Sequence, residues 1–457
     1  SSLIFSPLSI YKQKKMNTYK FYIRSLYLSC VTILMLGFSS CQIDEVLDPN
    51  GPSLQAIINN ASRSDLQLVV TGAESLLRKQ LNFYYFSTGI IGREVYLFTS
   101  ADPRYTGELL GRAESVLDNA GFYGTRPYSG RYITIRNTNI LIQAVTNNAQ
   151  KLSLTTEEIN GYNAFAHAIQ AYELHLALNM QYQNGIRVDV ADPDHLGPFL
   201  NYDQSLAAIQ SLLTTAATEL SNAGSTFPFK LSSGFTGFDT PATFRLFVKA
   251  LAARISIYQG DKAAAATNLG ESFLDVAGDL YAGPYRPYST SSGDQSNEIY
   301  RTPNQSEAFL AHPSYVNDIE PGDDRISKVL ARDTLKLDDL SSTYDCVVYP
   351  SLSSPISLIR NEELILIRVE ARIGSNNTGA VEDLNVIRNA HGLPNYSGGT
   401  DDASLVDELL KQRRYSLYAE GHRWVDMRRY GRLSQLPIDR PGDDVWQELP
   451  RPVTEVQ

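Results

Sequence analysis

The stretch of sequence that decides the fold lies near the C-terminus and reads Glu420-Gly421-His422-Arg423-Trp424-Val425-Asp426-Met427-Arg428-Arg429-Tyr430-Gly431-Arg432. Charges of both signs alternate there with large apolar residues, and Trp424, Met427 and Tyr430 recur at helical spacing. Charge at this density beside a tryptophan is typical of a structural ionic network, in which arginine stems pack against the indole. We therefore predict a clamp that closes the last helices, and we expect the loss of Arg423 to destabilise the fold before it weakens ligand binding.

Helical periodicity continues from this stretch back through most of the chain. Several predicted helices come in pairs with short connections, such as Gln259-Gly260-Asp261, and carry alanine where paired helices would cross. Such hairpins are typical of stacked tetratricopeptide-like repeats, so the pattern predicts an all-α fold. The expected helices cover residues 53–80 with a break near Ser64, 132–145, a segment that begins at the Thr155/Thr156 cap, 202–221, 241–259, 262–277, 361–373, 379–390 and 403–430.

Two long stretches, at about residues 83–130 and 280–355, lack helical periodicity and are rich in turn-forming residues. The second contains one short strand-like run, Cys346-Val347-Val348-Tyr349. Loops of this length in a compact protein are usually functional. We therefore expect ligand contacts in these loops rather than on the helices.

The first forty residues are typical of a targeting segment. Five basic residues and no acid precede an apolar run over 26–38, and Met16 is the expected translational start. Ser39, Ser40 and then Cys41 follow this run, which resembles a bacterial lipoprotein signal. We predict a signal peptide over 1–40, lipidation of Cys41 and a tether over 41–52. The alternative is an ordinary secretory signal followed by an incidental cysteine.

The cysteine count and the net charge limit the disulfides and the partners that the chain can have. Of three cysteines only Cys346 would remain free, so the mature chain cannot hold an internal disulfide, and Cys346 is expected to be packed rather than reactive. The net charge is −10, and removing the first forty residues leaves 35 basic against 50 acidic residues. An acidic body argues against nucleic acid as a partner.

No motif in the sequence predicts catalysis or metal binding. The six histidines show no His-Glu-x-x-His arrangement or ligand set with cysteine, and a Gly-x-Ser-x-Gly elbow is missing. The acidic pairs Asp323-Asp324 and Asp401-Asp402 are interpreted as turn or helix N-terminal acids, with a cation site as the alternative. We therefore predict no catalytic residue, metal or cofactor, although a carboxylate pair for glycoside cleavage stays open because its spacing is three-dimensional.

Two C-terminal blocks resemble a known family. The first reads Asn361-Glu362-Glu363-Leu364-Ile365-Leu366-Ile367-Arg368-Val369-Glu370-Ala371-Arg372, and the second is the 411–433 stretch with its Glu-Gly-His-Arg-Trp core. In this order and spacing they are similar to the SusD/RagB family of Bacteroidetes outer-membrane nutrient-binding lipoproteins. Gln412 and Ser416 stand where the family often has glutamate, which puts the pairing of the network in question.

The resemblance implies one SusD-like domain over 53–457, with helical repeats and ligand-binding loops. It also implies a non-enzymatic role at the outer membrane, facing the cell exterior. Such a protein captures a nutrient, commonly a glycan, and hands it to a SusC-like TonB-dependent transporter. The alternatives are a surface lipoprotein enzyme that processes glycans, and a helical-repeat scaffold without a small ligand.

Tyrosines in the loops are the candidate ligand-binding residues. Sugar rings pack their C–H faces on aromatic rings, and the chain has 27 tyrosines but only two tryptophans, both in the C-terminal region. A tryptophan platform is therefore not expected, which leaves room for a peptide ligand, and burial is the alternative for every tyrosine. The candidates are Tyr96, Tyr105 and Tyr123 in the first loop region, and Tyr281, Tyr285 and Tyr288 in the second.

Overall fold

The computed structural model describes residues 53–455. The predicted signal peptide, the lipidation site Cys41 and the tether lie outside the described residues. Within residues 53–455, none of the helices combines the length and the apolar character needed to cross a membrane.

The first helices of the described chain are α2 (Leu54–Asn60), α3 (Arg63–Leu76), α4 (Leu81–Ile91) and α5 (Phe122–Asn148). Ser62 forms a capping box with Asp65, which begins α3 and breaks the helix expected over 53–80 close to the predicted position. α4 lies where an irregular loop was expected, because it is apolar on all sides and so shows no helical period. α5 begins well before residue 132, since packing overrides the poor helix formers Gly124, Pro127 and Gly130.

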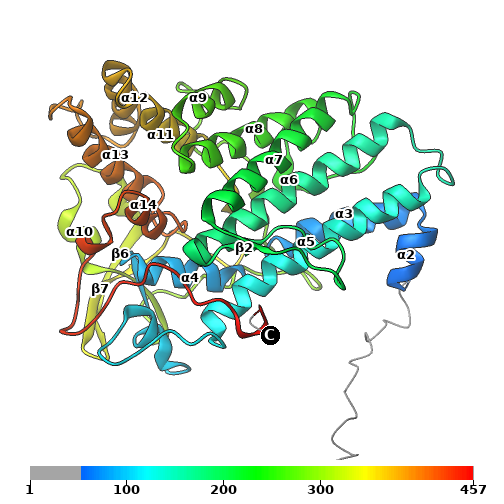
Figure 1. The fold of residues 1–457 in the computed structure, drawn as a ribbon. Helices are drawn as coiled ribbons and strands as arrows, with labels where there is room; N and C mark the ends of the chain where they lie inside the picture. The colour runs from blue at the N-terminus through cyan, green and yellow to red at the C-terminus, as the bar shows by residue number, and fades with distance from the viewer. Residues whose placement is uncertain (1–52, 456–457) are drawn as a thin grey trace, which may run out of the picture. The chain divides into compact units, whose positions relative to one another are not determined.

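A row of antiparallel neighbours follows, in which each helix packs against the next (Figure 1). These helices are α6 (Thr156–Gln181), α7 (Tyr202–Ser221), α8 (Pro241–Tyr258) and α9 (Lys262–Gly270). A capping box between Thr155 and Glu158 begins α6, as the sequence predicts. Ala250 and Ala253 of α8 are buried together with Ala265 of α9, which lets the backbones approach closely. The predicted tetratricopeptide-like helical fold is confirmed.

The C-terminal helices are α10 (Pro313–Asp318), α11 (Asn361–Arg372), α12 (Asn377–Ala390), α13 (Asp402–Ser416) and α14 (Arg423–Arg429). The single helix expected over 403–430 is therefore two helices. Ala419 and Gly421 have φ angles of 58° and 82°, which a continuing helix cannot accommodate. A Cβ atom on Gly421 would lie 2.9 Å from the Tyr84 ring, so the turn also needs a residue without a side chain.

An antiparallel sheet occupies much of the loop-rich part. Its strands are β1 (Val95–Phe98), β5 (Ala308–Ala311), β7 (Leu340–Cys346) and β6 (Val329–Leu337), in that order. Tyr96 pairs with Leu310, and Leu310 pairs with Asp345. The predicted strand-like run is displaced, because β7 ends at Cys346 rather than beginning there.

Two short ladders complete the strands: β2 (Ile186–Arg187) with β3 (Phe199–Leu200), and β4 (Tyr285–Arg286) with β8 (Ile356–Ser357). A large hydrophobic core extends from Ala61 to Leu449 and includes Trp424. A smaller core joins α11, α12 and α13 through residues such as Ile365, Leu384 and Leu409. Short 3-10 turns cover Pro103–Tyr105, Glu108–Leu110, Tyr182–Asn184, Ser233–Phe235, Asp324–Lys328, Leu433–Gln435 and Val453–Glu455.

Candidate functional site

The three candidate tyrosines of the first loop region are core residues. Tyr96, Tyr105 and Tyr123 are 2%, 8% and 0% exposed. Tyr96 stacks on Phe98 with ring centroids 5.6 Å apart, and Tyr105 meets Phe122 edge to face at 5.2 Å. Their ring faces are occupied by protein, so a sugar cannot stack on them in this structure. The physical reason is the unpredicted sheet and the early start of α5, which turn this region into core.

The second loop region places its tyrosines in three different settings. Tyr281 is 64% exposed, and the Arg360 guanidinium lies 5.1 Å from its ring centroid. Tyr285 is partly buried on β4, where it pairs with Ser357. Tyr288 lines a polar pocket.

This Tyr288 pocket has a volume of about 300 Å³ and lies at the turn between α3 and α4. One wall comes from that turn, and the other comes from the polar loop that follows Tyr288. The lining is rich in donors and acceptors and includes Arg78, Gln80, Asn82, Asp294, Asn297 and Glu298. A ring surrounded by polar groups suits a sugar, which presents C–H faces and hydroxyls together.

Arg78 ties the two walls of the Tyr288 pocket together. Its guanidinium donates to the Pro287 carbonyl at 2.9 Å and to Asp294 Oδ1 at 2.8 Å, and lies 5.7 Å from the Tyr288 ring centroid. Arg78 Nε and Asn82 Oδ1 are buried and have no hydrogen-bond partner within the described part of the chain. Buried polar atoms without a partner carry an energetic cost that a hydrogen bond would remove. Burial raises the pKa of Tyr288 to about 12, so its hydroxyl stays protonated and can donate at neutral pH.

A buried arginine positions both walls. Arg286, two residues before Tyr288, donates to the Leu77 carbonyl at 3.1 Å and to the Tyr172 hydroxyl at 2.5 Å. The Leu77 bond fixes the end of α3 to β4, and so holds the turn against the 288–299 loop. On the opposite side, a Cβ atom on Gly130 would lie 2.4 Å from the Lys79 carbonyl oxygen. The turn therefore needs glycine at this point of α5.

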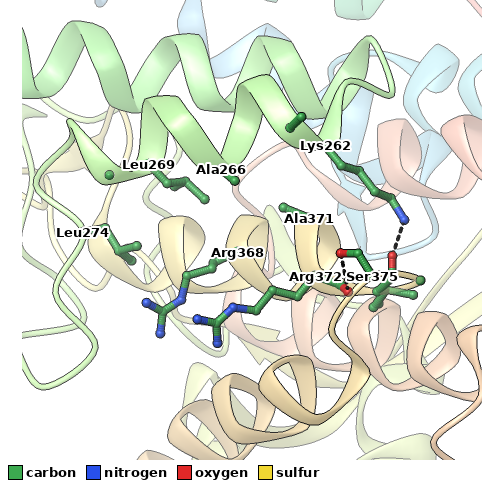
Figure 2. Close-up of a pocket in the computed structure, with 12 residues that line it drawn as sticks. Lys262, Ala266, Leu269, Leu274, Arg368, Ala371, Arg372 and Ser375 are labelled. Atoms are coloured by element: carbon green, nitrogen blue, oxygen red, sulfur yellow. Dashed lines mark hydrogen bonds between the residues drawn. The ribbon is translucent and has the colours of Figure 1, made fainter.

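A larger cavity of about 660 Å³ lies between α9 and α11 (Figure 2). Alanine and leucine side chains, including Ala266, Leu269 and Ala371, line it, and no aromatic ring contributes. Lys262 Nζ donates to the Ile373 carbonyl at 2.6 Å. Arg368 and Arg372 also border the cavity, but both bind Asp383. The cavity therefore offers an apolar surface with committed polar groups, which suits a sugar less well than the Tyr288 pocket does.

The predicted ionic network is present beneath the C-terminal stretch, and we call it the clamp. Arg254 forms two 2.7 Å hydrogen bonds with Glu363. Burial raises the pKa of Glu363, but the Arg254 guanidinium outweighs this effect and the pKa falls to about 2. The remaining clamp pairs join Arg360 to Glu362 and Glu420, Arg413 to Asp426, and Arg429 to Glu370.

Arg423 is not part of the clamp, which corrects the prediction made for it. Among the described residues it forms no hydrogen bond or ion pair, and its side chain borders a separate pocket. Burial and the nearby Arg414 lower its pKa to about 10. The alternation of charges along the sequence does not reveal this difference, because Arg429 of the same helix takes its partners from Asp426 nearby and from Glu370 on the distant α11.

The two departures from the family pattern have a structural explanation. Gln412 Oε1 and Ser416 Oγ accept hydrogen bonds of 2.7 Å and 2.8 Å from the buried Arg325 guanidinium. The acidic partner of Arg325 is instead Asp323, whose carboxylate lies 2.7 Å from the guanidinium. Asp323 is thus a buried ion-pair partner, which supports the structural interpretation of the Asp323-Asp324 pair over a cation site.

The remaining side chains that could bind a metal or act as a nucleophile do not form a cluster within the described part of the chain. No set of three or more His, Cys, Asp or Glu residues within 53–455 is arranged to hold a metal ion. Cys346 is buried, as the sequence predicts, and burial raises the pKa of its thiol to about 12. This thiol is therefore not a nucleophile at neutral pH.

The fold and the site together define a tetratricopeptide-like helical protein with a loop-built, tyrosine-bearing polar pocket. Residues 351–448 match the family model of the SusD family. The SusD-like protein P38 of Formosa agariphila is 34% identical over 128 residues, which make up 25% of this chain and 25% of that protein. The aligned part therefore spans about a quarter of the length of this relative.

Solved structures match over nearly the whole chain. A SusD superfamily protein from Bacteroides vulgatus is 17% identical, with a TM-score of 0.66 over 87% of this chain and 97% of its own. Surface glycan-binding protein A from Bacteroides thetaiotaomicron is 14% identical, with a TM-score of 0.66 over 88% and 97%. A laminarin-binding SusD-like protein is 17% identical, with a TM-score of 0.62 over 86% and 97%. The chain therefore shares the fold of these structures, and its residues 351–448 are similar to the SusD family.

Proposed function

We propose that this protein is a surface-exposed, lipid-anchored subunit that captures an oligosaccharide and delivers it to a SusC-like TonB-dependent transporter. The observation that carries the proposal is the Tyr288 pocket, which combines a ring with unpaired polar atoms. The shared fold supports it, since one structural neighbour is a surface glycan-binding protein solved with laminarihexaose. In this role the Tyr288 pocket holds the sugar and the helical repeats contact the transporter.

Binding of laminarihexaose to the purified protein tests the pocket by calorimetry. Replacing Tyr288 by Ala is expected to weaken binding about tenfold or more, because the sugar loses its stacking surface and a hydroxyl partner. Tyr281→Ala is the matched control, since its exposed ring lies outside the pocket, and it should bind like the wild type. Equal loss in both variants would remove the Tyr288 pocket from the proposal.

The same measurement tests the scaffold alternative, and a separate assay tests the enzyme alternative. Saturable binding of an oligosaccharide rules out a scaffold that has no small ligand. Incubating the protein with polysaccharides and assaying for released sugars tests the enzyme alternative. Steady release of product would replace the binding role with a catalytic one.

Anchoring is tested at Cys41. Replacing it by Ala is expected to abolish lipid labelling and to move the protein from the membrane fraction to the soluble fraction. Cys346→Ala is the control, because Cys346 is a buried free thiol and its loss should leave labelling unchanged. A Cys41→Ala protein that stays attached to membranes would contradict the lipid anchor.

A further inference from the structure

A second pocket, away from Tyr288, lies against α13 and α14. It has a volume of about 300 Å³, and its wall includes Lys411, Arg414 and Tyr415 of α13 together with Arg423 and Met427 of α14. Asp318 at the end of α10 contributes to the same wall. Figure 1 shows these three helices at the same end of the fold. We call this site the Arg423 pocket.

Every cation of the Arg423 pocket except Arg423 itself has an acidic partner. Arg414 binds Asp318 at 2.9 Å, and Lys411 binds Glu320 at 2.7 Å. Arg432, which also lines the pocket, binds Asp407. Arg423 has neither a hydrogen bond nor an ion pair within residues 53–455. The pocket therefore carries one surplus positive charge in a chain whose net charge is −10.

Glu94 is the acid with the largest electrostatic effect on Arg423, but it does not cancel this positive charge. Glu94 is buried, and burial raises the pKa of its carboxyl to about 8 despite the opposing effect of Arg423. At neutral pH Glu94 is therefore mostly protonated and uncharged. The charge of Asp426 also reaches Arg423, but its carboxylate is bound by Arg413 at 2.6 Å and by Arg429 at 3.1 Å.

A second group of the same pocket lacks a partner. The side chain of Tyr415 is 1% exposed, and its hydroxyl has no hydrogen-bond partner among the residues that the structure describes. A buried hydroxyl without a partner is unfavourable when the pocket is empty, and the partly buried Arg423 guanidinium has no acid to balance its charge. An oxyanion would satisfy both, because arginine pairs with a carboxylate through two hydrogen bonds.

We propose that the Arg423 pocket binds an oxyanion, and that its ligand is the carboxylate of an acidic sugar. Its volume is at the lower end for small-ligand sites and suits one sugar ring. Leu410 and Met427 provide the apolar part of the wall on which a ring can rest. The identification of the ligand as a sugar rests on the proposed function, whereas the oxyanion site stands on the unpaired groups alone.

Galacturonate, galactose and acetate are the probes, each titrated into the purified full-length protein by calorimetry. Galacturonate should bind at least about tenfold more tightly than galactose, which has a hydroxymethyl group in place of the carboxylate, because a hydrogen bond between charged groups contributes about that much to affinity. Arg423→Met should remove this preference. Tyr415→Phe, which removes a single hydroxyl, should weaken galacturonate binding by about two- to tenfold.

Arg63→Met is the charge-matched control, since Arg63 pairs with Glu158 at the surface, and it should bind galacturonate like the wild type. A thermal melt shows that each variant is folded. Unchanged galacturonate binding in both Arg423→Met and Tyr415→Phe overturns the site. Acetate that binds as tightly as galacturonate overturns the acidic sugar as the ligand. Failure of the wild type to bind laminarihexaose counts against the Tyr288 pocket and leaves this site intact.

Discussion

Replacing Arg254 by Met is expected to lower the free energy of unfolding by about 3–5 kcal/mol, because it leaves the Glu363 carboxylate buried without its partner. The side chains of Arg254 and Glu363 are 5% and 2% exposed, so water cannot replace the lost bonds. Arg254 also donates to the Leu358 carbonyl at 3.0 Å, which ties α8 to the segment before α11. Urea unfolding followed by circular dichroism measures the change.

Two variants show whether the effect is that of a buried pair. Arg63→Met removes a surface pair with Glu158 and should cost less than about 1 kcal/mol. The double variant Arg254→Met, Glu363→Met removes both charges, and it should be more stable than the single variant. A single variant no less stable than the Arg63 control would show that the clamp does not hold the fold together.

Acid unfolding reports on the same pair. The pKa of Glu363 is about 2 in the folded protein, below its ordinary value of about 4.3 in an unfolded chain. A lowered carboxyl pKa stabilises the fold above the unfolded value, and this contribution is lost as pH falls from about 4.3 to about 2. Arg254→Met should therefore flatten the dependence of stability on pH in this window.

The helical part of the fold could be predicted because its signals are local. The capping boxes at Ser62 and Thr155 and the apolar stripes of the central helices depend only on nearby residues. The sheet could not be predicted, since β1 pairs with β5 across about two hundred residues of sequence. β1 and β5 are also buried at every position, so they show no alternation between polar and apolar residues.

The Tyr288 pocket is built from residues that lie far apart in the sequence, so the sequence alone does not show that they are in contact. Tyr288 was among the candidates because tyrosine beside a polar loop suits a sugar. Its partner Arg78 lies at the end of a helix far away in the chain, and Arg286 brings the two together. The polar run Ser289–Asn297 after Tyr288 was the available signal for the second wall of this pocket. Charge patterning likewise predicted the clamp, but not that Arg423 stands outside it.

Replacing Trp424 by Ala is expected to cost about 3–5 kcal/mol of unfolding free energy, the range for the loss of a buried large aromatic side chain. Trp424 is fully buried, and its indole N–H donates to the Trp446 carbonyl at 2.7 Å. The Arg428 guanidinium lies 4.7 Å from its ring centroid, so the substitution also removes the surface on which this arginine packs. The Trp424 backbone nitrogen would lie 3.0 Å from a Cβ atom on Gly92, and this tight approach limits collapse of the cavity.

Two further variants, Trp424→Phe and Trp446→Ala, separate the loss of buried ring area at residue 424 from the contribution of the neighbouring Trp446. The phenyl ring keeps most of the buried area but not the hydrogen bond, so Trp424→Phe should lose about half as much stability as Trp424→Ala. Trp446 is only partly buried, and its replacement by Ala should cost less than that of Trp424. Thermal melts of the three variants rank them directly. If Trp446→Ala proved the most damaging, the C-terminal segment around Trp446, rather than Trp424 itself, would hold the last helices in place.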